Sequence, residues 1–392
     1  MQNQEVYDEL MAKFEKLYGM KPAAVAYAPG RIEVLGNHTD YNEGFVFSAA
    51  IDKGTFFAVA PSEDTKCSLT AGDFMETVEF DIANVAPAKE MTWQNYVTGT
   101  FNWLFDDEPA KAGKGWKGMF LGNIPLGAGL SSSAALEMCT ALALCKLYGI
   151  EKDKTTLAKI GQKAEHTFAG CPCGLLDQAS SLYGKEGGLV KSDFRYCKFE
   201  NVALGPTVAF MMVKSNAKHA LVDGAYACRR QACEDAANYF AGVLKHPVTH
   251  LRDVSCAEWV LYRGGLSETT AKRAIHPIGE DERVLRGAEL LEKGDLAGFG
   301  ALMFDSHESS RNWFENSCPE LDTIVDIAKT LPEVYGARLS GGGFGGSCCL
   351  LVDPKAAEQI AAAITADYKA AYGDKPSCAL IEPSEGAHVV RQ

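Results

Sequence analysis

Glycines and serines are concentrated in one segment that could hold a phosphate group. Residues 125–135 read Pro-Leu-Gly-Ala-Gly-Leu-Ser-Ser-Ser-Ala-Ala, and an apolar pattern typical of a buried helix runs from Ser133 to about Tyr148. Glycine lets the backbone approach an anion closely, and free N–H groups at a helix start can bind it. The lysine of a Walker A motif is missing. A serine N-cap after a flexible turn would explain the same residues, so phosphate binding and simple capping are equally open here.

Polar side chains of several kinds are crowded into residues 29–44. Arg31, Asn37, His38, Asp40 and Asn42 all fall in this turn-rich stretch. A carboxylate, an imidazole and an amide can each bond one or two hydroxyls, so the set suits a hydroxyl-rich ligand such as a sugar. The alternative is a polar surface loop, which composition alone would favour.

Two further segments carry residues suited to phosphoryl chemistry. Glu165 and Asp177 lie in residues 164–178 and are candidate carboxylates for Mg²⁺ and for a substrate, although a solvated helix or cap carboxylate would look the same. Five glycines fall within residues 341–346 and run into an apolar strand. Such a run marks a tight bend or a close ligand approach, and by itself it is a weak signal.

The elements that must position these residues mix strands and helices without regular alternation. The first is an amphipathic helix with Val6, Leu10, Phe14 and Leu17 on one face, ended by Gly19. Ile32 and Val34 alternate with polar neighbours as in a strand. Further strands are predicted at residues 45–51 and 55–60 (with a turn at 52–54), 120–124, 208–214 and 348–352, and helices at 226–244, 280–292, 321–330 and 355–372. This mixture predicts the α+β class.

The composition of the chain limits the classes of partner that it is expected to bind. A chain of 392 residues suggests two or three domains, and its formal charge of −13 argues against nucleic acid or an anionic membrane as the main partner. The N-terminus shows no secretion signal, and no apolar run is long enough to cross a bilayer. Thirteen scattered cysteines without a C-x-x-C pair predict reduced thiols in a cytoplasmic protein, and no zinc ligand set is evident.

In this order and spacing the motifs resemble those of the GHMP kinases. The sequence of residues 30–44 (GRIEVLGNHTDYNEG) resembles that of the galactokinase branch. Three further segments do so as well: CPCGLLDQ at 171–178, SNAKHALVDGAYACRRQACE at 215–234 and SHESSRNWFENSCPELD at 306–322. The resemblance covers nearly the whole chain. It implies an S5-domain-2-like N-terminal lobe (1–205), a ferredoxin-like C-terminal lobe (206–392), and an active site in the cleft between them.

The resemblance also assigns expected roles to residues. It implies that Asp177 lies by the anomeric hydroxyl of a sugar, and Arg31 between that hydroxyl and the γ-phosphate of ATP. Other sugar contacts would come from Asn37, His38, Asp40, Gly174 and Tyr226, and Mg²⁺ would lie near Ser133 and Glu165. Expected ATP contacts are Pro125, Gly127, Ala128, Gly129, Leu130, Ser131, Ser132, Ser133, Ala134, Gly342 and Gly343, with Trp93 and Tyr96 at the adenine. A monomer is expected.

One residue departs from the galactokinase pattern. Where galactokinases usually carry Glu, near the C6 end of the sugar, this chain has Asn37. The change removes a negative charge and replaces an acceptor-only group by an amide. Galactose is therefore the first expected substrate, and another hexose such as a uronic acid is the alternative. A non-catalytic sugar sensor is disfavoured because the serines at 131–133, Arg31 and Asp177 are all retained.

Overall fold

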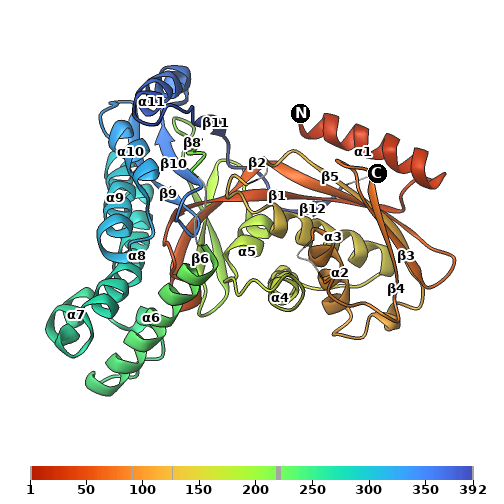
Figure 1. Cartoon of the computed structure of the whole chain (residues 1–392), viewed down its shortest axis with the longest axis horizontal. Helices are drawn as coiled ribbons and strands as arrows, with labels where there is room; N and C mark the ends of the chain where they lie inside the picture. Colours follow the sequence, from red (N-terminus) through yellow and green to blue (C-terminus); the bar gives the residue numbers. More distant parts are fainter. Residues whose placement is uncertain (1, 90–91, 126, 218–221, 391–392) are drawn as a thin grey trace.

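Eight strands form the larger of two sheets in the computed structural model, which describes residues 2–89, 92–125, 127–217 and 222–390 (Figure 1). The strand order is β12-β1-β2-β5-β3-β4, while β6 pairs with the other end of β2 and β7 with β6. Among the described strands of this sheet, β3 and β5 are the one parallel pair. The strands are β1 (Ala24–Leu35), β2 (Phe45–Pro61), β3 (Lys66–Ala71), β4 (Glu76–Asp81), β5 (Trp116–Gly122), β6 (Gly188–Asp193), β7 (Lys198–Ala203) and β12 (His388–Val389).

Helices cover both faces of this sheet (Figure 1). On one face lies α1 (Asn3–Tyr18), which buries Val6, Leu10 and Phe14 and ends at Gly19 with φ 67°. Leu17 was predicted to share their face, but it is not buried with them, since it is 43% exposed. The fourth residue on this face, again four positions further along the helix, is Tyr18, whose hydroxyl lies 2.9 Å from that of Thr70. The opposite face is covered by α2 (Gln94–Leu104), α3 (Ser132–Tyr148), α4 (Lys154–Ala164) and α5 (Leu176–Tyr183).

The smaller sheet has the antiparallel order β11-β8-β10-β9. Its strands are β8 (Ala209–Lys214), β9 (Val334–Ser340), β10 (Ser347–Val352) and β11 (Ser377–Ile381). An apolar cluster joins it to α10 (Pro319–Ala328) and α11 (Ala357–Tyr372), and α9 (Leu296–Ser309) packs along β9. A helical arm completes this half (Figure 1), formed by α6 (Val222–Val243), α7 (Cys256–Tyr262) and α8 (Glu268–Glu292) around a third apolar cluster.

Several predicted boundaries differ from the structure. The strand predicted at 120–124 is β5, which begins four residues earlier, and the helix predicted from 226 is α6, which begins at 222. Two larger differences have a physical cause. Residues 52–54 do not form a turn, because β2 runs unbroken from Phe45 to Pro61. They lie where β2 passes from β6 to β5 as its neighbour, and a Cβ on Gly54 would come within 2.5 Å of the Ala28 carbonyl oxygen on β1. The glycine thus serves a close approach of strands. The helix predicted from residue 280 begins already at Glu268, with Pro277 inside it.

The C-terminal segment returns to the larger sheet. His388 of β12 pairs with Tyr27 of β1, and Pro383 bridges to Ile51. The predicted division into residues 1–205 and 206–392 falls between β7 and β8, with this returning segment as an addition to the first part. That division stays a prediction.

Among the helices in the described ranges, none combines the length and the apolar character needed to cross a membrane.

Candidate functional site

Two adjoining cavities lie between the larger sheet and the loop that joins β9 to β10. One measures about 680 Å³ and the other about 500 Å³. Arg31 from β1 and Gly341 and Gly342 from the β9–β10 loop line both. Segments from opposite ends of the sequence therefore meet at the junction of the cavities.

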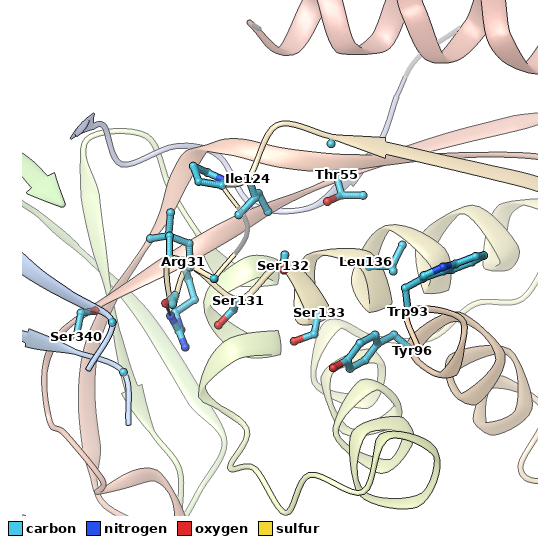
Figure 2. Close-up of a pocket in the computed structure, with 18 of the residues that line it drawn as sticks. Arg31, Thr55, Trp93, Tyr96, Ile124, Ser131, Ser132, Ser133, Leu136 and Ser340 are labelled. Atoms are coloured by element: carbon cyan, nitrogen blue, oxygen red, sulfur yellow. Dashed lines mark hydrogen bonds between the residues drawn. The ribbon is translucent and has the colours of Figure 1, made fainter. Parts of the chain in front are cut away.

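The glycine–serine segment lines the larger cavity and leads into α3 (Figure 2). Gly127 and Gly129 have φ of 64° and 70°, in the left-handed region that glycine adopts without steric cost. Ser131 occupies the N-cap position with φ 53°, but its side chain does not cap the helix. Its hydroxyl donates to Asp177 Oδ2 instead. The N–H groups of the first turn of α3 therefore have no side-chain cap, as an anion site requires.

Most of the residues expected to contact ATP line this larger cavity. They are Trp93, Pro125, Gly127, Ala128, Gly129, Leu130, Ser131, Ser132, Ser133, Gly342 and Gly343. Ala134, in the first turn of α3, does not, because its side chain is fully buried. Trp93 and Tyr96 lie with Leu136 at the end of the cavity away from Arg31 (Figure 2). The cavity thus has an aromatic end and a polar, glycine-rich end.

Arg31 links this cavity to the second one. Its Nε donates to Asp177 Oδ1 at 2.7 Å, and its Nη1 donates to the Gly129 carbonyl oxygen at 2.6 Å. Arg31 is only 6% exposed. Burial acts to lower the pKa of this guanidinium, but the carboxylates of Asp177, Glu33 and Asp40, Asp177 foremost, together outweigh it and the net pKa is raised. A fixed positive charge therefore lies between the glycine loop and the carboxylate.

The second cavity collects the residues expected to hold a sugar: Asn37, His38, Asp40, Gly174, Asp177 and Tyr226. Gly174 is required by close packing, since a Cβ there would lie 1.6 Å from Asp40 Oδ2. Burial, followed by the nearby Glu33 carboxylate, raises the pKa of Asp40 to about 7. The lining is rich in hydrogen-bonding groups, as recognition of hydroxyls requires.

His38 joins the polar segment to the β9–β10 loop. Its Nε2 lies 3.1 Å from the Gly342 carbonyl oxygen, and its Nδ1 lies 2.8 Å from the Tyr41 hydroxyl. Burial lowers its pKa to about 4, so the ring is neutral at pH 7. Since the carbonyl can only accept, Nε2 carries the proton and Nδ1 accepts from Tyr41. Both ring nitrogens are thus engaged within the protein.

Ser133 and Glu165 lie together, as a shared magnesium site requires. Glu165, at the start of the π-helical turn Glu165–Ala169, lies close enough to the Ser133 side chain for that side chain to favour its charged form. It is 5% exposed, and burial raises its pKa. Mg²⁺ takes oxygen ligands and usually keeps waters and substrate phosphates alongside one or two protein groups, so this pair fits it. In the described ranges there is no group of three or more His, Cys, Asp or Glu side chains that could hold a metal.

The structure adds residues that the sequence interpretation missed. Glu33 lines the second cavity, and Ser340, whose hydroxyl lies 3.2 Å from the Glu33 carbonyl oxygen, lines the first. The signal for Glu33 was present, because side chains two apart on a strand share a face and Arg31 is two residues away. Ser340 ends an apolar strand, and nothing in the sequence distinguishes it.

Three family models that match more than half of the chain, and one solved structure that matches nearly all of it, indicate the same family. Residues 12–61 match the galactokinase galactose-binding signature, residues 95–185 the N-terminal domain of GHMP kinases, and residues 288–370 their C-terminal domain. A galactokinase from Lactococcus lactis, solved with galactose, is 30% identical with a TM-score of 0.91, over 98% of this chain and 99% of that one.

More distant structures share the fold. Mevalonate kinase from Methanococcus jannaschii is 17% identical with a TM-score of 0.62, over 92% of this chain and 98% of that one. Homoserine kinase from Cytophaga hutchinsonii is 16% identical with a TM-score of 0.61, over 95% and 98%. The expected α+β, two-lobed architecture is confirmed. The chain belongs to the galactokinase branch of the GHMP kinase family, and it is an ATP-dependent phosphotransferase with an alcohol group as acceptor.

Proposed function

We propose that this protein transfers the γ-phosphoryl group of ATP to the anomeric hydroxyl of galactose, giving galactose 1-phosphate and ADP. The observation that carries the proposal is the position of Arg31. Its guanidinium bonds the glycine loop of one cavity through Gly129 and the carboxylate of the other through Asp177. A phosphate held in the first cavity and a hydroxyl held in the second would therefore meet at this side chain.

The nucleotide would occupy the larger cavity. The uncapped first turn of α3 and the left-handed glycines at 127 and 129 suit its phosphates. The aromatic end formed by Trp93 and Tyr96 suits the base. Ser133 and Glu165 would hold Mg²⁺, which when bound supplies charge neutralisation at the phosphates.

The sugar would occupy the smaller cavity with its anomeric hydroxyl at Asp177. Phosphoryl transfer depends mainly on positioning and charge stabilisation. Asp177 orients the hydroxyl and accepts its proton, while the Ser131 hydroxyl and Arg31 Nε fix the carboxylate in place. Arg31 also neutralises charge that develops on the transferred group.

Galactose is favoured over other sugars by two findings. The galactose-binding signature covers residues 12–61, which include Arg31, Asn37, His38 and Asp40. The Lactococcus relative was solved with galactose bound. The competing substrate class is a uronic acid, which the absence of Glu at position 37 would permit.

A substrate panel tests the proposal. Purified protein with Mg-ATP is given galactose, glucose, galacturonate and glucuronate, and ADP release is followed in a coupled assay. We expect the highest kcat/KM with galactose. An equal or higher kcat/KM with either uronate would overturn the choice of sugar. Action as a cytoplasmic monomer stays a prediction, to be tested by light scattering and by localisation in cells.

A further inference from the structure

Asn37, the residue that departs from the galactokinase pattern, is already engaged by the protein. Its Nδ2 donates to Glu33 Oε1 and to the Gly341 carbonyl oxygen, both at 2.8 Å, and its Oδ1 accepts from Asn316 Nδ2 at 3.0 Å. An amide has two donor hydrogens, and both are used here. Asn37 is 1% exposed. It therefore has no hydrogen left to donate to a sugar.

Glu33 is oriented by these same contacts. Its Oε1 accepts from Asn37 and, at 3.2 Å, from Nη1 of the fully buried Arg338. Among the residues that the structure describes, every hydrogen bond to this carboxylate goes to Oε1. Glu33 lines the second cavity although it is only 3% exposed. Its Oε2 is thus the oxygen available to a ligand there.

The position of Glu33 along β1 sets which part of a sugar it could reach. Arg31 and Glu33 are two residues apart on one strand, so they share a face at a separation of roughly 7 Å. This distance is comparable to the span of a pyranose with its hydroxyls. A sugar whose anomeric hydroxyl lies at Arg31 and Asp177 would place its far end, at C4 and C6, near Glu33.

We propose that Glu33 is a specificity-determining residue that accepts a hydrogen bond from a hydroxyl at the C4–C6 end of the sugar, with Asn37 and Arg338 as its positioning residues. The inference rests on the proposed function, which places the sugar in this cavity. The negative charge missing at position 37 is then supplied from position 33. The cavity is lined by the carboxyl groups of Glu33, Asp40 and Asp177. Arg31 pairs with Asp177 and Arg338 with Oε1 of Glu33, while the raised pKa of Asp40, about 7, leaves it partly protonated at neutral pH. A C6 carboxylate would face Glu33 directly, so the site selects a neutral sugar.

The variant Glu33→Gln tests this role by replacing one carboxylate oxygen with an NH₂ group. Asn37 and Arg338 both donate, so they would hold the new amide with its oxygen toward them and its NH₂ group toward the cavity. The acceptor offered to the sugar becomes a donor. Affinity for galactose, measured by calorimetry without ATP, should fall about 10- to 100-fold, the loss typical of a hydrogen bond to a charged group. The affinity for galacturonate relative to that for galactose should rise about 10-fold, because the variant no longer places a negative charge near a C6 carboxylate.

Deoxy sugars distinguish a direct contact from general damage. One of two sugars, 4-deoxygalactose or 6-deoxygalactose, lacks the hydroxyl that Glu33 contacts. The wild type and Glu33→Gln should bind that sugar with equal affinity. Glu43→Gln is the matched control, because Glu43 belongs to the same segment but pairs with Arg195 Nε at 2.7 Å and does not line the cavity. It should leave galactose affinity unchanged. Circular dichroism checks that each variant is folded.

Binding and turnover separate this inference from the proposed function. An equal loss of affinity for galactose and for both deoxy sugars, or no loss for galactose, overturns the role of Glu33 even if galactose is phosphorylated. Glu33-dependent binding without any sugar phosphate supports this role and rejects the proposed function. A wild-type protein that binds no galactose contradicts both.

Discussion

Asp177→Asn is the change that most sharply tests how the site works. The substitution keeps the size of the side chain and one oxygen that can accept from Arg31 Nε, which lies 2.7 Å from Oδ1 in the wild type. It removes the negative charge and the ability to take a proton. Loss of a positioned general base lowers a rate by about 10²- to 10⁴-fold. We therefore expect kcat to fall by that factor, equivalent to about 3–5 kcal/mol of barrier.

The same change should cost little stability. Breaking a fully buried ion pair costs about 3–5 kcal/mol. Here the Asp177 side chain is 27% exposed to the cavity, and asparagine still accepts from the guanidinium, so about 1–2 kcal/mol is expected. The unfolding midpoint should fall by a few degrees. ATP binding should be nearly unchanged, because Gly129 still accepts from Arg31 Nη1.

The assay combines steady-state kinetics with ATP titration of the variant. Asp295→Asn is a matched control, since Asp295 caps α9 through the Gly298 N–H and asparagine caps equally well. It should keep wild-type kcat. Retention of more than a few per cent of wild-type kcat by Asp177→Asn would refute the assignment of Asp177. A large loss of ATP affinity would show instead that the variant has disturbed the glycine loop.

Three further changes test other parts of the site. Gly174→Ala would place a Cβ 1.6 Å from Asp40 Oδ2, so kcat/KM for galactose should drop about 100-fold while the affinity for ATP stays unchanged. An unchanged kcat/KM for galactose would contradict this close packing. Trp93→Ala should raise KM for ATP about 10-fold through loss of base stacking while leaving KM for galactose alone; the reverse pattern would move the nucleotide elsewhere. Asp40 has a folded pKa of about 7, above its unfolded value, so the stabilisation from its proton is complete below about pH 4 and is lost as pH rises to 7. Thermal melts should therefore show the wild type losing stability relative to Asp40→Asn over pH 4–7, and a pH-independent difference would show that the pKa is not raised.

The order of elements and the two glycine segments could be predicted because they depend on local signals. Helix α1 ends at Gly19, whose φ of 67° suits glycine, and α3 begins within one residue of its predicted start. The turn expected at 52–54 failed because Gly54 marks close strand contact rather than chain reversal. The early start of α8 was missed because Pro277 usually ends a helix, whereas here it lies within one whose buried residues pack on other parts of the fold.

The partners within the site could not be predicted from local pattern. The joining of Arg31 to Gly129 and Asp177 links residues far apart in sequence, which only the fold brings together. Asn37 was expected to contact a sugar, but its hydrogen bonds to Gly341 and Asn316 depend on elements about 280 or more residues later. Ala134 was expected at ATP because it belongs to the motif, yet the helix turns its methyl group into the core.

The most direct test of the account is to identify where the phosphate goes. Protein incubated with Mg-ATP and galactose is examined by phosphorus-31 and proton NMR, and the sugar phosphate is assigned by its phosphorus–proton coupling. Transfer across Arg31 to a hydroxyl held by Asp177 predicts one product whose phosphorus couples to the anomeric proton. A phosphate at any other carbon, or inorganic phosphate as the only product, would contradict it.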